Sequence, residues 1–213
     1  MKKNIVNHLE IAKKILDRAC EENRYRDKEI MQGIDGEKAH SLAVYNWIIK
    51  IDKNAPLALQ ITALFHDVDR IVNPGVGAGF KGDRTSIDYI AHKKAHAKRS
   101  ADYICPILIK EGFDEQLVKR IEFLILHHDD PGNEVESIND KDLHTLVNSD
   151  SLAFFDTIAQ KLYKIEGEDR LKDKVRYMIR KMSPYGREVL RKQKIEEPLF
   201  EKIKNEILKE NVY

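Results

Sequence analysis

The sequence has little cysteine and no excess of charge of one sign. Its two cysteines, Cys20 and Cys105, lie far apart and form no C-x-x-C pair, which argues against a disulfide framework or a cysteine-based zinc site. Lysine and arginine total 37 and aspartate and glutamate total 36, so the net charge is +1. Proteins that bind nucleic acids or membranes through charge usually carry a marked basic excess. We therefore expect no generic nucleic-acid binding and no membrane partner.

Long apolar runs are also missing. The first ten residues, MKKNIVNHLE, interrupt their apolar side chains with charges and lack the apolar region of a secretory signal. No stretch approaches the apolar length that a membrane span requires. These absences predict a cytoplasmic protein. A chain of 213 residues is long enough to bury a substantial core without disulfide bonds.

Helical periodicity is what the sequence has in abundance. Val44, Trp47, Ile48 and Ile51 recur at intervals of three and four, as apolar side chains on the buried face of a helix do. Similar stripes follow one another toward the C-terminus, and strand-like alternation is nearly absent. We therefore expect an all-α fold. The chain has no internal repeat and no convincing linker, which favours a single domain over residues 1–213.

Helix-breaking residues predict several boundaries. Pro106 is expected to kink or break a helix over about residues 86–111. Asp114 is a candidate N-cap for the next helix, which the segment DDPG at 129–132 should end. Residues 73–82, NPGVGAGFKG, carry four of the ten glycines and predict a loop that covers or shapes a binding site. This segment lacks the Lys-Ser/Thr ending of a phosphate-binding P-loop.

Several histidine and aspartate residues fall on apolar helix faces. His40 lies four residues before Val44, and Asp150 falls between Val147 and Phe154. Burying a charge costs several kcal/mol unless the charge is paired or bound to a metal. A divalent metal can serve as the common partner of such residues from different helices, because imidazole and carboxylate suit zinc, iron, manganese and nickel. The candidate ligands are His40, His66, Asp67, His96, His127, His128 and Asp150.

The order of these residues resembles the H…HD…H…H…D signature of the HD superfamily of metalloproteins. The segments AHSLAVYNW, ALFHDVDRI and NSDSLAFFD resemble the helices that carry the first, middle and last ligands of that family. The resemblance covers about residues 36–156. It implies an HD-domain helical bundle, with additional C-terminal helices at about 157–213 packed on this core.

The resemblance also implies a set of metal ligands. A first metal would be held by His40, His66, Asp67 and Asp150, and Asp67 would bridge to a second metal held by His96 and by His127 or His128. The additional histidines resemble the subset of the family that holds two metals. One or two divalent ions are expected, with iron and manganese favoured and zinc, nickel, cobalt or magnesium as alternatives.

Two choices among the histidines stay open. His92 and His96 lie on one helix face at i and i+4; His96 is preferred because HAKRSADYI resembles the family's spacing, and His92 would then touch substrate. The adjacent His127 and His128 point about 100° apart on a helix, so both reach one cluster only if the helix ends there. The pair resembles that of HD-GYP phosphodiesterases, but the GYP tripeptide is absent, which argues against cyclic di-GMP as substrate.

The expected reaction is hydrolysis of a phosphate monoester or diester, such as a nucleotide, by metal-activated water. Asp67, His96 and Arg70 are assigned to catalysis. The residues assigned to binding a small phosphorylated substrate are His92, Lys94, Arg180 and Lys181. Two alternatives remain: a di-iron oxygenase resembling the inositol-oxygenase branch of the superfamily, and a catalytically silent HD domain that binds a ligand. The sequence is compatible with a homo-oligomer but does not predict one.

Overall fold

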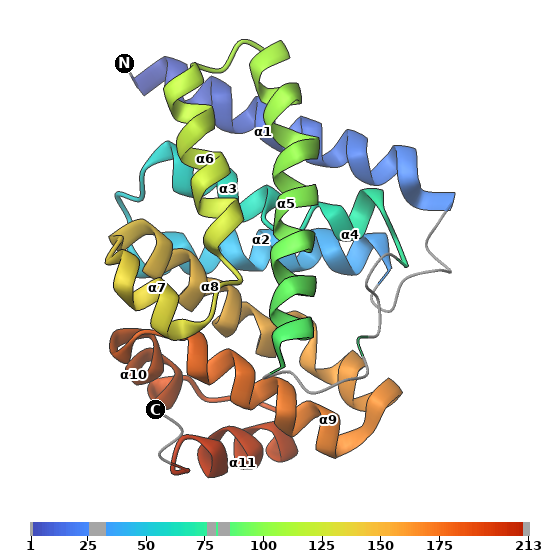
Figure 1. The fold of residues 1–213 in the computed structure, drawn as a ribbon, viewed down its shortest axis with the longest axis vertical. Coiled ribbons are helices and arrows are strands. Elements are labelled where there is room, and N and C mark those ends of the chain that lie inside the picture. The colour runs from blue at the N-terminus through green and yellow to red at the C-terminus, as the bar shows by residue number, and fades with distance from the viewer. Residues whose placement is uncertain (1, 26–32, 76–79, 81–85, 211–213) are drawn as a thin grey trace.

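The computed structural model describes residues 2–25, 33–75, 80 and 86–210, and within them it consists of helices and their connections (Figure 1). The helices are α1 (Lys2–Asn23), α2 (Ile34–Ile51), α3 (Leu57–Phe65), α4 (Asp69–Val72), α5 (Ile87–Lys110), α6 (Glu115–His127), α7 (Gly132–Ile138), α8 (Lys141–Thr157), α9 (Ala159–Lys181), α10 (Pro184–Lys192) and α11 (Pro198–Ile207). No strand occurs in the described ranges, which confirms the all-α class. Most of the glycine-rich segment 73–82, expected to be a loop near the site, lies outside the described residues.

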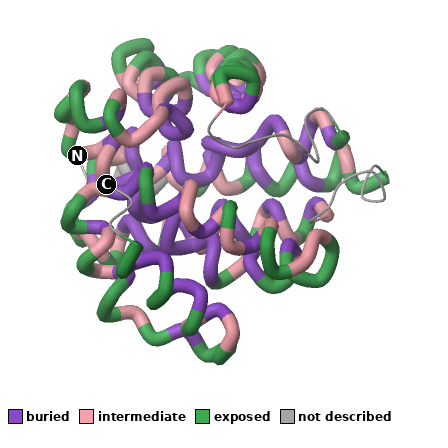
Figure 2. The backbone as a smooth tube through the Cα atoms, turned by 60° about the horizontal axis from the view of Figure 1, so that its bottom comes forward, coloured by how far each residue is buried: buried purple, intermediate pink, exposed green. Residues whose placement is uncertain are grey.

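The apolar side chains gather in two clusters that meet at α3. One cluster includes Leu16 from α1 and Ile104 from α5, and the other includes Phe154 from α8. Leu64 of α3 belongs to the first cluster and Leu59 of the same helix belongs to the second. The buried residues accordingly run through the middle of the molecule, with the exposed ones outside them (Figure 2). Because α3 is buried on opposite faces, the residues that follow it are delivered to the centre of the protein.

The helix boundaries follow local hydrogen-bonding signals. The side chain of Asp114 accepts hydrogen bonds from the backbone N–H groups of Gln116 and Leu117 and so caps α6. The predicted helix break at Pro106 is wrong, because α5 continues through this residue to Lys110. Pro106 lies on the exposed side of α5, as does Asp102 one turn earlier. The Asp102 carbonyl, which loses its intrahelical donor at Pro106, can therefore be hydrated.

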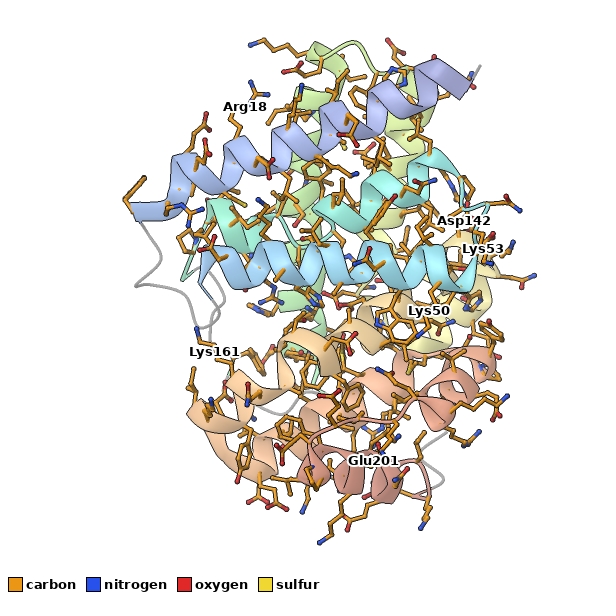
Figure 3. All side chains as sticks on the ribbon, turned by 180° about the vertical axis from the view of Figure 1, so that it is seen from behind. Arg18, Lys50, Lys53, Asp142, Lys161 and Glu201 are labelled. Atoms are coloured by element: carbon orange, nitrogen blue, oxygen red, sulfur yellow. The ribbon has the colours of Figure 1, made fainter. Side chains whose placement is uncertain are left out.

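The C-terminal helices pack on the rest of the chain. α9 packs against α8, and α11 packs against α9 (Figure 1). The apolar stripe expected in this region is buried and consists of Leu171, Val175, Met178, Ile179 and Met182. Charged side chains such as Arg18 on α1 and Lys53 in the turn after α2 lie on the outside of the protein (Figure 3). Within the described ranges, no helix combines the length and the apolar character needed to cross a bilayer.

The corner between α9 and α10 is held tightly on α8. Asn148 of α8 accepts a hydrogen bond from the Ser183 backbone N–H at 3.0 Å and donates one to Ser183 Oγ at 2.8 Å. Ser183 in turn caps α10 by accepting from the Gly186 N–H. Gly186 is required at this place because a Cβ would overlap the Asn148 side-chain amide. The corner is therefore fixed on α8 by two hydrogen bonds and one close contact.

Replacing Gly186 with alanine should lower the free energy of unfolding by about 1–3 kcal/mol, the usual cost of overpacking a close contact. The measurement is urea denaturation of the wild-type protein and the variant. Lys192→Ala, on an exposed position of the same helix, is the matched control and should change the stability by less than about 0.5 kcal/mol. Equal stabilities for Gly186→Ala and wild type would contradict the close approach to Asn148.

Candidate metal centre

Four buried imidazoles and three buried carboxylates meet where the helices cross. His40 lies on α2 and His96 on α5, whereas His66 and His128 come directly after α3 and α6. None of the four histidines is more than 3% exposed. The carboxylates are those of Asp67, Asp129 and Asp150.

The seven side chains form two groups. In the first, His40 Nε2 lies 3.0 Å and His66 Nε2 lies 3.7 Å from Asp150 Oδ1. In the second group, His96 Nε2 lies 2.6 Å and His128 Nε2 lies 3.4 Å from Asp67 Oδ1. The ligand atoms of each group lie within 4.8 Å of one another.

Asp129 belongs to the second group, and Asp67 connects the two groups. Asp129 Oδ2 lies 3.2 Å from His128 Nε2. The second carboxylate oxygen of Asp67 lies 4.0 Å from His66 Nε2 of the first group. The rings of His66 and His128 are in edge-to-face contact, with centroids 5.1 Å apart. The two groups are therefore neighbours that share the space around Asp67.

The backbone determines the tautomer of His66 and His128. His66 Nδ1 lies 3.0 Å from the carbonyl oxygen of Ala63, and His128 Nδ1 lies 2.6 Å from that of Ile125. A carbonyl oxygen only accepts hydrogen bonds, so each Nδ1 carries a proton and donates it. In the neutral rings Nε2 is then unprotonated, and its lone pair faces the carboxylates.

His40 and His96 are held in the same way. The hydroxyl of Thr157 donates to the Ala153 carbonyl at 2.8 Å, so its oxygen accepts from His40 Nδ1 at 3.0 Å. His96 Nδ1 donates to Asp69 Oδ2 at 2.8 Å. All four imidazoles thus present Nε2 to the centre while a second partner orients the ring, which is the usual arrangement around metal-bound histidine.

This arrangement fits a divalent cation. An unprotonated Nε2 and a carboxylate oxygen are both acceptors and repel each other unless a positive charge lies between them. The buried Nε2 atoms of His66 and His128 have no hydrogen bond of acceptable geometry, although carboxylate oxygens lie 3.2–4.0 Å away. The imidazole and carboxylate donors match the preferences of first-row divalent metals. The two groups can therefore hold metal ions.

The electrostatics of the centre favour a positive charge. Burial opposes protonation of His128, yet Asp129 and Asp67 outweigh it and raise the pKa of this imidazole to about 9. Burial also opposes ionisation of Asp67, but Arg70 and the neighbouring histidines hold the pKa of this carboxyl well below its usual range. Burial lowers the pKa of His40, which favours the neutral form that can ligate a metal.

The structure distinguishes between the members of the two histidine pairs that the sequence left open. It brings His96 and His128 into the second group. His127 lies outside both groups, because its Nδ1 pairs with Asp130 Oδ2 at 2.6 Å and its ring packs on Phe123. His92 lies outside them as well and contacts the ring of Phe80. The sequence interpretation that included His127 among the ligands therefore has no support from the geometry.

The remaining residues assigned from the sequence lie at different depths. Arg70 donates to Asp67 Oδ2 from Nε at 2.8 Å. Lys181 is buried between Asp129 and Asp150, whereas Arg180 is exposed. Lys94 is exposed and pairs with Glu134 at 2.8 Å, away from the centre.

The pairings of four charged residues at the centre were not predicted from the sequence. Asp69 orients His96 and is itself held by Arg99, whose Nη2 lies 2.8 Å from it. Asp129, interpreted only as part of a helix-ending turn, is 5% exposed and pairs with buried Lys93. A signal for two of these residues was present. Asp69 repeats the aspartate two positions after Asp67, and Lys93 lies one helical turn before His96.

A cavity of about 1270 Å³ adjoins the centre. Asp129 and Lys181 line the cavity on the side of the candidate metal ligands. The aromatic rings of Tyr89 and Tyr177 and the side chain of Arg180 also line its wall. The cavity is large enough for a small organic ligand.

A family model described as "Domain of unknown function (DUF4202)" matches residues 11–203. The chain belongs to the DUF4202 family. A search of curated proteins and a search of solved structures each found no match. The DUF4202 match includes both groups of His and Asp residues and continues through the C-terminal helices that carry Lys181. The matched region therefore extends beyond the helices that carry the His and Asp residues.

Replacing His128 with alanine should weaken Mn²⁺ binding by more than the roughly 10–100-fold that loss of a supporting hydrogen bond costs. The reason is that the variant loses a buried Nε2 directed at Asp67. His127→Ala, at the adjacent position, should retain wild-type metal content. Inductively coupled plasma mass spectrometry after reconstitution and desalting measures both, and metal loss in His127→Ala alone would contradict the placement of the pair.

Replacing Asp69 with asparagine should lower the Mn²⁺ affinity by about 10–100-fold without removing a ligand, because the negative partner of His96 Nδ1 is lost. Asp102→Asn, an exposed aspartate on the same helix as His96, is the control. Titration calorimetry measures both variants. An unchanged affinity in Asp69→Asn would show that the His96 ring needs no charged support.

Proposed function

We propose that this DUF4202 protein is an HD-type metal-dependent phosphohydrolase that acts on a phosphate monoester or diester. The observation that carries the proposal is the convergence of four oriented, buried Nε2 atoms on Asp67, Asp129 and Asp150. The residues concerned follow the order of the HD signature along the chain. That order, together with the helical fold, supports the HD assignment.

The ligand set divides naturally between two ions. His40, His66 and Asp150 would hold one, with Asp67 as the shared carboxylate. The second would be held by Asp67, His96, His128 and Asp129. A divalent ion bound in such a site lowers the pKa of water toward neutrality and withdraws charge from a phosphoryl oxygen.

Arg70 is suited to bind the phosphoryl group. Its Nε donates to Asp67, and its terminal nitrogens have no hydrogen-bond partner among the described residues. Its side chain is 35% exposed, so it stands at the boundary between the buried ligands and the outside. A guanidinium in this position orients Asp67 with one N–H and can donate to a phosphate oxygen with the others.

His96 is suited to hold and move a proton. Its Nδ1 donates to Asp69, and its Nε2 faces Asp67 at 2.6 Å. Burial opposes ionisation of Asp69, but hydrogen bonds from His96 and Arg99 lower the pKa of this carboxyl, so that His96 Nδ1 has a negatively charged partner. If one metal is bound by the first group alone, His96 can act as the general acid or base through Nε2.

Phosphate release by the reconstituted protein tests the proposal. Protein loaded with Mn²⁺, Fe²⁺, Zn²⁺ or Ni²⁺ is assayed with p-nitrophenyl phosphate, its diester and a set of nucleoside monophosphates. Activity should follow metal content, and Asp67→Ala should lower kcat by about 1000-fold, or roughly 4 kcal/mol at 1.36 kcal/mol per tenfold.

Asp102→Ala, an exposed aspartate that pairs with Lys98, is the control and should retain activity. Metal-loaded protein that releases phosphate from none of these esters would overturn the proposal. Oxygen consumption by the iron-loaded protein in the absence of phosphate release would instead favour the alternative function, a di-iron oxygenase.

A further inference from the structure

The buried ammonium group of Lys181 lies between the two groups of candidate metal ligands. Its Nζ lies 2.6 Å from Asp150 Oδ2 and 3.2 Å from Asp129 Oδ1, and the residue is 3% exposed. Asp150 belongs to the first group and Asp129 to the second. One lysine thus neutralises a carboxylate from each group, as a metal ion there would.

The fold is built to hold Lys181 in this position. It is the last residue of α9, and the corner that follows is anchored to α8 by Asn148. On the other side, Gly132 of α7 approaches the Arg180 backbone so closely that a Cβ would overlap the carbonyl oxygen. Gly186 lies equally close to Asn148, because a Cβ at this position would overlap the Asn148 side-chain amide. Two glycines therefore permit the packing that inserts this lysine.

The carboxylates at the centre already have cationic partners without a metal. The three carboxylates of the two groups, and Asp69 that orients His96, form the pairs Asp67–Arg70, Asp69–Arg99, Asp129–Lys93 and Asp150–Lys181. Imidazoles that bind a metal are neutral. Each divalent ion therefore adds two uncompensated positive charges to a buried site, and burying net charge is costly. An anion that enters with the metal removes this cost.

The cavity offers a place for that anion next to Lys181. Lys181 and Arg180 both line the cavity, and Lys181 Nζ lies 5.6 Å from the centroid of the Tyr177 ring in its wall. The flexible four-carbon stem lets the ammonium group move while the backbone stays fixed. The imidazoles face Asp150 Oδ1 and Asp129 Oδ2, whereas Lys181 contacts the other oxygen of each carboxylate. A metal on the imidazole side draws charge away from the oxygens that hold the ammonium group and repels that group.

We propose that Lys181 couples metal binding to the binding of a phosphate-class anion. In the metal-free protein it holds Asp150 and Asp129, and in the metal-bound protein it turns toward the cavity and binds the anion. The inference rests on the metal centre of the proposed function but not on hydrolysis. By thermodynamic linkage, the anion must tighten metal binding by the same factor by which the metal tightens anion binding.

Titration calorimetry of Mn²⁺ binding, with and without inorganic phosphate, tests the coupling in the wild-type protein. Phosphate should tighten Mn²⁺ binding by about tenfold, within the usual range for coupled sites. Lys181→Met should bind Mn²⁺ more tightly than wild type in the absence of phosphate, because the cation that repels the metal is gone, and phosphate should then have little effect. Lys141→Met is the matched control, since Lys141 lines the same cavity but its side chain is 80% exposed.

Thermal unfolding provides a second readout. Metal-free Lys181→Met should unfold at a lower temperature than wild type, because Asp150 loses its lysine, and Mn²⁺ should raise its midpoint by more than it raises that of wild type. Lys181→Gln, which keeps hydrogen-bonding capacity without charge, replaces the methionine variant if that variant does not fold.

The outcomes separate this inference from the proposed function. Wild-type protein that binds Mn²⁺ with the same affinity in the presence and absence of phosphate overturns the role of Lys181, as does a Lys181→Met variant that keeps full coupling. Coupling without phosphoester hydrolysis supports the role of Lys181 and contradicts the hydrolase. Wild-type protein that binds no divalent metal overturns both.

Discussion

The buried carboxylate of Asp67 is the constraint on which the centre depends. It stands one residue beyond His66, at the end of a helix that is buried on opposite faces. A carboxylate in that place is tolerated only if cations and hydrogen-bond donors surround it, and they come from Arg70, His96 and His128. Helix α6 must therefore pack against α3, and α5 against α6 and α4, closely enough to deliver these imidazoles. The packing of these helices therefore determines the geometry of the centre.

The ion pairs around the centre do not explain the stability of the protein. A buried ion pair recovers in Coulomb attraction roughly what it loses in desolvation, and apolar side chains of similar volume would serve stability as well or better. The two apolar clusters supply the favourable burial, and the charged centre lies between them. Buried, mutually perturbed titratable groups concentrated in one place are typical of functional sites. The arrangement is therefore better explained by binding and chemistry than by folding.

The sequence was informative where a signal is local. Helix periodicity, the Asp114 cap and the inward faces of His40 and Asp150 each depend on residues within a few positions, and the structure agrees with them. The choice between His127 and His128 was not predictable, because it depends on where α6 ends to within one residue, and one residue turns a side chain by about 100°.

Pairs that are distant along the chain were beyond the reach of sequence reasoning. Lys181 contacts Asp129 from 52 positions away, and Lys93 pairs with the same carboxylate. The sequence analysis assigned Lys181 to substrate binding, but no pattern in a single sequence indicates that Lys181 and Lys93 are buried against Asp129. The same reasoning explains the missed role of Asp129, since a turn segment such as DDPG indicates only where a helix stops.

The C-terminal helices add two cations to the centre and to the cavity beside it. A bundle formed by residues up to Asp150 alone would surround its ligands with Arg70, Lys93 and Arg99. Helix α9 adds Lys181 at the centre and the exposed Arg180 beside it on the cavity wall. Together with the metal of the proposed function, these two cations would stabilise an incoming anion better than a neutral polyol. That difference favours a phosphate ester over a sugar alcohol as the ligand, and it arises from a part of the chain that lies outside the HD-like signature.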